Sequence, residues 1–191
     1  MNKCWYYLKT FPAASINKSD FIDDSLLLKD FDFKTVNHSQ ILNQQISNWF
    51  NKYNLIPTEF FIFSRKINVD STYHVDMSIL PGGLPYSLHK CAINIELLGS
   101  GIQNFYYSAI KGLLLVDSNK KFASYDFNKE HLTLLDTCKF RNVSLVKTDV
   151  VHHVKSQTSN RVVLSIRFTD KNNKFLSLEE TKHILSKEAY R

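Results

Sequence analysis

Apolar residues recur along this chain with two different periods, and the period of each segment predicts its secondary structure. Within residues 37–53 they follow the spacing of one helix face, with Asn37 or Ser39 as a candidate N-cap and Pro57 beyond the end. Near the C-terminus, Ser177 and Glu180 have the spacing of a capping box ahead of a second apolar stripe. We therefore predict an amphipathic helix over residues 37–53 and a closing helix over residues 177–190.

Between these helices the period changes to short segments rich in Phe, Tyr, Ile and Val, separated by Asn, Asp, Ser, Gly and Lys turns. The predicted strands lie near residues 59–67, 72–77, 91–97, 104–108, 112–117, 132–135, 143–147, 150–155 and 161–168. Strands that do not alternate with helices indicate a mainly β fold with flanking helices, an antiparallel sandwich or barrel. The chain has only 5 Gly and contains neither GxGxxG nor GxxxxGK[ST], which argues against a nucleotide-binding α/β fold.

Composition narrows the class of protein further. With 191 residues, 43% of them hydrophobic, the chain is long enough for a single domain with a sizeable core. It has no apolar run near the roughly 20 residues of a membrane span, and its 3 Cys form no CxxC pair, so we expect a cytoplasmic protein without membrane contact. The net charge of +6 arises after residue 138, where basic residues are spread over strands, turns and the closing helix. This spread argues against nucleic-acid binding, which stays a third alternative, whereas the positive charge itself favours anionic ligands.

A candidate metal site begins at His74 and Asp76, which are two residues apart on a predicted strand and therefore project from the same face. Such a pair alone is a weak signal and needs a third ligand. His152 or its neighbour His153 offers one, some 78 residues later. Two histidines and one carboxylate leave positions open on a metal, as suits non-haem Fe(II) and oxygen chemistry.

The segment 148–168 predicts a hairpin with a six-residue loop, in which Val154 pairs with Arg161. In that register His152 shares its face with Arg161 and Ser165, whereas His153 points to the outer layer among apolar residues. The outward face of the second strand carries Val162, Leu164, Ile166 and Phe168, which we expect to pack against helices. A register shifted by one residue would exchange the roles of the two histidines.

The order HxD, about 80 residues, His, then Arg nine residues later resembles the Fe(II)/2-oxoglutarate-dependent oxygenases. His74, Val75 and Asp76, then His152 and Arg161, match that pattern. The segments 152–154 and 161–164 look most like the aspartyl/asparaginyl β-hydroxylase branch and the small phage and bacterial prolyl-hydroxylase-like members. The resemblance implies a double-stranded β-helix, a cupin-like jelly roll, over the core of the chain.

The resemblance also implies roles for individual residues. His74, Asp76 and His152 would be catalytic and bind Fe(II), and Arg161 would hold the distal carboxylate of the co-substrate 2-oxoglutarate during its reaction with O2. Many relatives have a Ser two residues after this Arg, where this chain has Val163. In its place, the co-substrate could be bound by one of three residues, Ser165, Asn94 or Tyr106.

The resemblance divides the chain into an N-terminal supporting strand and helix (1–58), a jelly-roll core (59–168) and a C-terminal helix (177–190), all in one oxygenase domain. Residues 82–86 are either a mobile substrate lid or a plain connection. The expected activity is hydroxylation of an amino-acid residue or small metabolite, with a small-molecule or peptide substrate, and Asp76 favours hydroxylation over halogenation. The alternative from another class is a non-catalytic jelly-roll binding or structural module.

Overall fold

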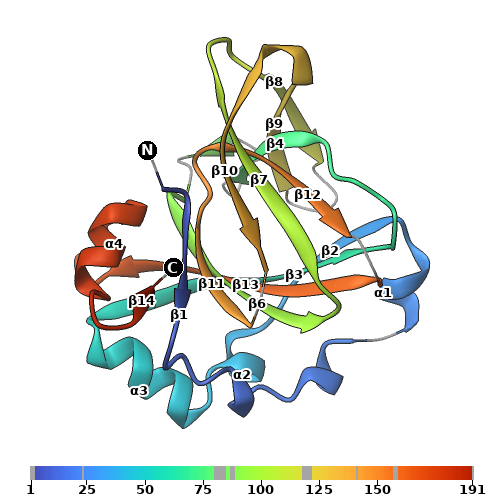
Figure 1. Cartoon of the computed structure of the whole chain (residues 1–191). Helices are drawn as coiled ribbons and strands as arrows, with labels where there is room; N and C mark the ends of the chain where they lie inside the picture. The colour runs from blue at the N-terminus through green and yellow to red at the C-terminus, as the bar shows by residue number, and fades with distance from the viewer. Residues whose placement is uncertain are drawn as a thin grey trace.

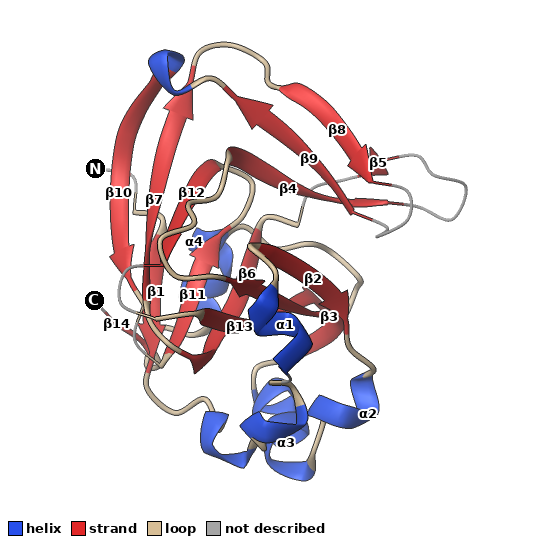
Figure 2. Ribbon diagram, turned by 90° about the vertical axis from the view of Figure 1, so that its right-hand side faces the viewer, coloured by secondary structure: helices blue, strands red, loops and turns tan. Residues whose placement is uncertain are grey.

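The structure is a computed structural model, and it describes residues 3–22, 24–79, 85–86, 89–117, 122–140, 142–156 and 159–190. Its strands form two antiparallel sheets that face each other (Figures 1 and 2). In spatial order, the first sheet contains β14 (Ala189–Tyr190), β1 (Trp5–Leu8), β11 (Val143–Lys147), β6 (Cys91–Leu98), β13 (Arg161–Asp170), β3 (Leu55–Arg65) and β2 (Phe31–Thr35). The second contains β10 (Leu132–Lys139), β7 (Gly101–Ser108), β12 (Val151–Ser156), β4 (Tyr73–Ile79), β9 (Phe122–Phe127) and β8 (Leu113–Asp117), with β5 (Pro85–Tyr86) paired to β4.

The chain passes back and forth between the sheets. Strands β3, β6, β11 and β13 are central in the first sheet, and β4, β7, β10 and β12 are neighbours in the second. This interleaving of two antiparallel sheets is a double-stranded β-helix, or jelly roll, and it confirms the predicted mainly β fold. All nine predicted strands are present. The supporting strand predicted within residues 1–58 is represented by two strands, β1 and β2, whereas β5, β9 and β14 were not predicted.

Helices cover the outer face of the first sheet, where their apolar side chains join one core with those of the strands. They are α1 (Asp24–Leu28), α2 (His38–Ile41), α3 (Gln44–Lys52) and α4 (Leu178–Ile184), and short 3-10 turns lie at Ala13–Ser15, Lys18–Asp20 and Lys129–His131. The outward apolar side chains of β13 pack into one core with Trp49 and Phe50 of α3, as predicted. Each fully buried aliphatic or aromatic side chain there contributes roughly 1.5–3 kcal/mol, so this layer holds the first sheet in place.

The helix predicted over residues 37–53 is two helices, with a break at Asn43. The side-chain oxygen of Asn43 accepts hydrogen bonds from the backbone N–H groups of Gln45 and Ile46, at 3.0 and 3.1 Å, and thereby caps α3. Its amide group also donates to the backbone oxygen of Ser15, at 2.9 Å. Asn43 thus starts a new helix where the apolar period alone predicted continuation.

The C-terminal helix begins at the predicted capping box, because Ser177 and Glu180 each accept from the other's backbone N–H. It ends at Ile184, not at residue 190 as predicted, since the chain turns there to form β14. Beyond the turn, buried Glu188 accepts hydrogen bonds from the backbone N–H and hydroxyl of Thr10 and from the Tyr53 hydroxyl. Burial alone would raise the pKa of Glu188, but these hydrogen bonds outweigh it and lower that pKa.

The hairpin predicted for residues 148–168 is wrong. Strand β12 pairs with β7 and β4 in the second sheet, whereas β13 pairs with β3 and β6 in the first. The chain therefore passes from the second sheet to the first between β12 and β13. A short polar segment can join strands of two different sheets as readily as it forms a turn between paired strands, so the sequence did not distinguish the two. The inward placement of His152 and Arg161 survives for a different reason, because the inner faces of the two sheets face each other.

Among the residues that the structure describes, no helix combines the length and the apolar content needed to cross a bilayer. The three cysteines form no disulfide and are buried, and Trp5 and Trp49 lie in the core. Of the segment 82–86, for which a lid and a plain connection were the two alternatives, residues 82–84 lie outside the described residues, and Pro85–Tyr86 form β5.

Candidate metal centre

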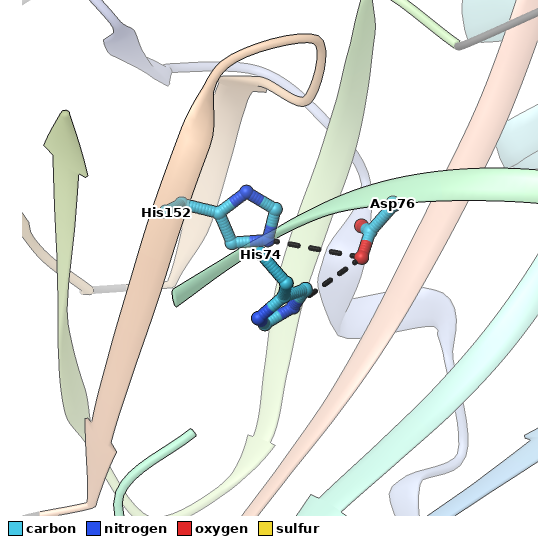
Figure 3. Close-up of side chains that lie close together, drawn as sticks. All are labelled: His74, Asp76 and His152. Atoms are coloured by element: carbon cyan, nitrogen blue, oxygen red, sulfur yellow. Dashed lines mark ion pairs between the residues drawn. The ribbon is translucent and has the colours of Figure 1, made fainter. Parts of the chain in front are cut away.

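Three side chains that are far apart in the sequence converge between the sheets (Figure 3). His152 of β12 is directly opposite His74 of β4, and Asp76 lies two residues further along β4 on the same face. The Oδ1 atom of Asp76 is 3.4 Å from Nε2 of His74 and 3.8 Å from Nε2 of His152. One ligand atom from each residue lies within 4.8 Å of the others, so the group can hold a metal ion.

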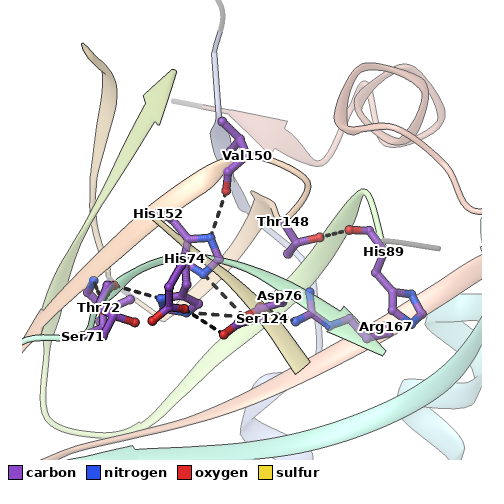
Figure 4. Close-up of polar contacts among 12 residues, drawn as sticks. Ser71, Thr72, His74, Asp76, His89, Ser124, Thr148, Val150, His152 and Arg167 are labelled. Carbon is purple, nitrogen blue, oxygen red and sulfur yellow. Dashed lines mark hydrogen bonds and ion pairs between the residues drawn. The ribbon is translucent and has the colours of Figure 1, made fainter. Parts of the chain in front are cut away.

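Each imidazole is oriented by the backbone of the residue just before its own strand (Figure 4). Nδ1 of His74 is 2.9 Å from the backbone oxygen of Thr72, and Nδ1 of His152 is 3.1 Å from that of Val150. A carbonyl oxygen only accepts, so both Nδ1 atoms carry the proton and donate. The Nε2 lone pairs are therefore left to face Asp76, as in histidines that bind a metal.

The carboxylate of Asp76 is held from the opposite sheet. Its second oxygen, Oδ2, accepts a hydrogen bond of 2.8 Å from Nη2 of Arg167 on β13 (Figure 4). The two oxygens of Asp76 thus have separate partners, with Oδ1 facing the imidazoles and Oδ2 facing a guanidinium. Buried Arg167 keeps Nε and Nη1 without a hydrogen-bond partner among the described residues.

The protonation states of Asp76 and His152 suit a metal site. Burial would raise the pKa of Asp76, but the charge of His152, the hydrogen bond from His74 and the charge of Arg167 outweigh it and lower that pKa. Burial, helped by the charge of His74, lowers the pKa of His152 to about 4. For His74, burial is outweighed by Asp76, and its pKa is raised. Asp76 is therefore ionised and His152 neutral at neutral pH, the forms that bind metal.

The three side chains line a cavity of about 340 Å³ between the two sheets. Three guanidiniums also line it, those of Arg65, Arg161 and Arg167, and all come from β3 and β13 of the first sheet. The cavity therefore joins a cation-binding group on one wall to a strongly basic wall opposite.

Arg161, the predicted co-substrate anchor, is buried in this cavity. Its Nε lies 3.5 Å from Oε1 of Glu96, and its guanidinium lies over the ring of Phe140 at 4.2 Å. A Cβ atom at Gly101 would lie 2.7 Å from the backbone oxygen of Lys155 and 2.8 Å from Cδ of Arg161. Glycine at this position therefore leaves the room that the Arg161 side chain occupies.

Two of the three alternatives for the co-substrate site also line the cavity. Asn94 of β6 and Ser165 of β13 are directly opposite each other, and Oδ1 of Asn94 is buried without a hydrogen-bond partner in the described part of the chain. Tyr106 does not line the cavity, which corrects the third alternative. Phe105, its neighbour on β7, occupies the inner face, so Tyr106 points outward and packs edge-on against Tyr73, with 5.2 Å between ring centroids.

His153 lies on the outer face of β12, as predicted, but its surroundings differ from the prediction. Its ring stacks on Tyr73, with 4.5 Å between centroids and 12° between planes, and its Nε2 is 3.6 Å from the Asp70 carboxylate. The prediction places His153 among apolar residues of β13 and the helices, but those residues pack on the first sheet, whereas His153 belongs to the second. The error follows directly from the wrong strand partner.

Arg65, Asp126 and Gln103 also line the cavity, and the sequence patterns predicted a role for none of them. Asp126 of β9 is directly opposite His74 and accepts a hydrogen bond of 2.8 Å from Ser124. The strand predicted over residues 59–67 contained Arg65, but only the pairing of β3 with β13 reveals that it lies beside Arg161.

No protein-family model matches the sequence, and no curated protein matches it significantly. Among solved structures, the chain is similar to a viral collagen prolyl hydroxylase from Paramecium bursaria Chlorella virus-1 in complex with 2-oxoglutarate, at 10% identity and a TM-score of 0.45, over 87% of this chain and 96% of that one. Oxalate oxidase in complex with the substrate analogue glycolate follows at 12% identity and a TM-score of 0.36, over 92% and 78%. Hazelnut (Corylus avellana) vicilin has 7% identity and a TM-score of 0.38, over 75% of this chain and 30% of the vicilin chain. At these values the likenesses assign no activity to this chain.

Proposed function

We propose that this protein is an Fe(II)- and 2-oxoglutarate-dependent oxygenase that hydroxylates an amino-acid residue or a small metabolite. One observation carries the metal part of the proposal. Nε2 of His74 and Nε2 of His152 lie 3.4 and 3.8 Å from Oδ1 of Asp76, while Nδ1 of each imidazole faces a backbone oxygen. When both imidazoles are neutral, three lone pairs converge in this way, and such an arrangement suits a cation.

The donor set favours iron over most other metals. Two imidazoles and one carboxylate on one side of a metal are typical of non-haem Fe(II) oxygenases, which keep further positions open. When bound, Fe(II) would supply the redox chemistry by which O2 and 2-oxoglutarate convert a C–H bond into C–OH, with succinate and CO2 as the other products.

The chain's own side chains have separate tasks in this proposal. His74, Asp76 and His152 hold the metal, and Arg167 keeps Oδ2 of Asp76 turned away from it. Arg161 orients 2-oxoglutarate, because its buried side chain lines the same cavity and its Nε has no hydrogen-bond partner in the described part of the chain. A planar fork of N–H donors matches the two oxygens of a carboxylate.

The first test is the anaerobic addition of Fe(II) and 2-oxoglutarate to the wild type and to Asp76→Ala. A free bidentate position on the metal should give a weak visible charge-transfer band in the wild type and none in the variant. Metal analysis of both proteins provides the control. Equal metal content in the wild type and Asp76→Ala would refute the metal site. Metal binding without a visible band on addition of 2-oxoglutarate would favour the non-catalytic module.

The second test concerns Arg161, and the matched change is Arg161→Lys. Lysine keeps the charge but loses the fork, so 2-oxoglutarate affinity should fall by about 1.5–3 kcal/mol, the scale of a charge-assisted hydrogen bond, while metal content stays near that of the wild type. Unchanged affinity would leave Arg167 as the next candidate for the anchor.

A further inference from the structure

Two arginines stand directly opposite each other on neighbouring strands of the first sheet. Arg65 of β3 pairs in register with Arg161 of β13, and both line the cavity. Directly opposite side chains have Cβ atoms about 4.5–5.5 Å apart, and like charges in these positions destabilise a sheet. The fold keeps two cations together here, so something else must compensate their repulsion.

The acidic residues nearby compensate it only in part. Glu96 reaches only Nε of Arg161, at 3.5 Å, and burial raises the pKa of its own carboxyl. The charge of Asp70 acts on Arg65, but its carboxylate lies 3.4 Å from Nζ of Lys155. Within the described part of the chain, Arg65 has no ion pair.

Each guanidinium lies over an aromatic ring. Arg65 lies over Phe31 at 4.7 Å, and Arg161 lies over Phe140 at 4.2 Å. Stacking uses the face of a guanidinium and leaves the N–H groups on its edge free to donate. Burial lowers the pKa of both arginines to about 10, so both stay charged at neutral pH.

We propose that Arg65 and Arg161 together form a two-guanidinium site for the terminal carboxylate of a dicarboxylic 2-oxo acid. This inference rests on the proposed function and deepens it, because it adds Arg65 as a residue that determines which co-substrate is bound. A carboxylate has two oxygens, so each guanidinium can donate to one of them, and the anion removes the repulsion between the two cations. The site therefore selects a 2-oxo acid with a second carboxylate over one without it.

The experiment compares Arg65→Gln with Lys66→Gln, which removes the same charge at the next residue, where the side chain is exposed. Each protein is loaded with Fe(II) under anaerobic conditions and titrated by calorimetry with 2-oxoglutarate and with 2-oxobutanoate, which lacks the distal carboxylate. Arg65→Gln should weaken 2-oxoglutarate binding by about tenfold to a hundredfold, the loss of one charge-assisted hydrogen bond. Its affinity for 2-oxobutanoate should equal that of the wild type, and Lys66→Gln should change neither.

The other outcomes each decide the question. Wild-type affinity of Arg65→Gln for 2-oxoglutarate would overturn the inference and leave the proposed function intact. Equal weakening of both 2-oxo acids would also overturn it, since Arg65 would then act on the fold and not on the distal carboxylate. A wild-type protein that binds neither 2-oxo acid would refute the proposed function, and this inference with it. Partial recovery of 2-oxoglutarate binding in Arg65→Lys would support the inference, because lysine restores the charge without the fork.

Discussion

Replacing His152 and His153 with alanine, one at a time, tests the candidate metal centre with two changes of equal size on adjacent residues. Both imidazoles are buried, and both belong to β12. Only the Nε2 atom of His152 faces Asp76, whereas His153 stacks on Tyr73 on the other face of the strand. We therefore expect metal loss from one variant and a loss of stability without metal loss from the other.

The size of each effect follows from the contacts that are removed. Four-ligand zinc sites bind with about 10–16 kcal/mol, so one ligand is worth roughly 2.5–4 kcal/mol, and His152→Ala should weaken metal binding by about a hundredfold or more. The stack of His153 on Tyr73 is worth about 0.5–1.5 kcal/mol beyond the area that it buries, so His153→Ala should cost about 1–2 kcal/mol. For a chain of this length, that lowers the unfolding temperature by about 2–8 °C.

Two measurements separate the variants. Competition with a chelator gives the affinity for Zn(II) or Fe(II), and thermal unfolding of the metal-free proteins gives the stability. The reasoning fails if His153→Ala loses the metal while His152→Ala keeps it, because the face assigned to each residue of β12 would then be wrong. Loss of metal from both variants would mean that the stack on Tyr73 positions the site.

Three further changes test other parts of the structure. Glu188→Gln should lower the free energy of unfolding by about 1.5–3 kcal/mol at neutral pH. Because the pKa of Glu188 is lowered in the folded state, its contribution to stability is present above the unfolded-state pKa of about 4.3 and disappears as pH falls through the folded-state pKa. Denaturation curves of the wild type and the variant should therefore converge in acid. Arg167→Gln removes the 2.8 Å hydrogen bond to Asp76 and should destabilise the metal-free protein by about 1.5–3 kcal/mol. Zn(II) should restore part of that stability, because it gives the carboxylate a new positive partner. Equal stability of the metal-free wild type and variant would contradict the expected role of the hydrogen bond. Gly101→Ala should lower the free energy of unfolding by about 1–3 kcal/mol and weaken 2-oxoglutarate binding, because the new methyl group would displace Arg161. An unchanged affinity for 2-oxoglutarate, measured by calorimetry, would argue against that displacement.

The fold could be predicted from local patterns because strands of a jelly roll alternate between inward and outward side chains. The outward apolar row of β13 was predicted correctly, together with its contact with helices. The partner of each strand could not be predicted, since alternation states which face a residue occupies and not which strand lies beside it. Asn43 shows the same limit for helices, because one side-chain cap divided an apolar stripe that looked continuous.

For the site, sequence order and face parity were enough to bring His74, Asp76 and His152 together, since all three depend only on which way a strand residue points. Tyr106 was misplaced because the sequence alone does not show whether Phe105 or Tyr106 faces inward; the pairing of Phe105 with His152 decides it. Arg65 could not have been found, because its closeness to Arg161 depends on the pairing of β3 with β13 across about 96 residues of sequence. The cytoplasmic location, the kind of substrate and the division of the chain at residues 58 and 168 stay predictions.

The candidate metal ligands and the stacked arginines belong to opposite walls of the cavity. His74, Asp76 and His152 all project from the second sheet, whereas Arg65 and Arg161 project from the first. Among the metal ligands, Asp76 already has one contact with the first sheet, the hydrogen bond from Arg167 of β13, and a molecule that reaches from the metal to Arg65 and Arg161 would add a second link between the sheets. We expect amide hydrogen exchange in β3 and β13 to slow most when metal and dicarboxylate are both present, because only then do both links hold the two sheets together.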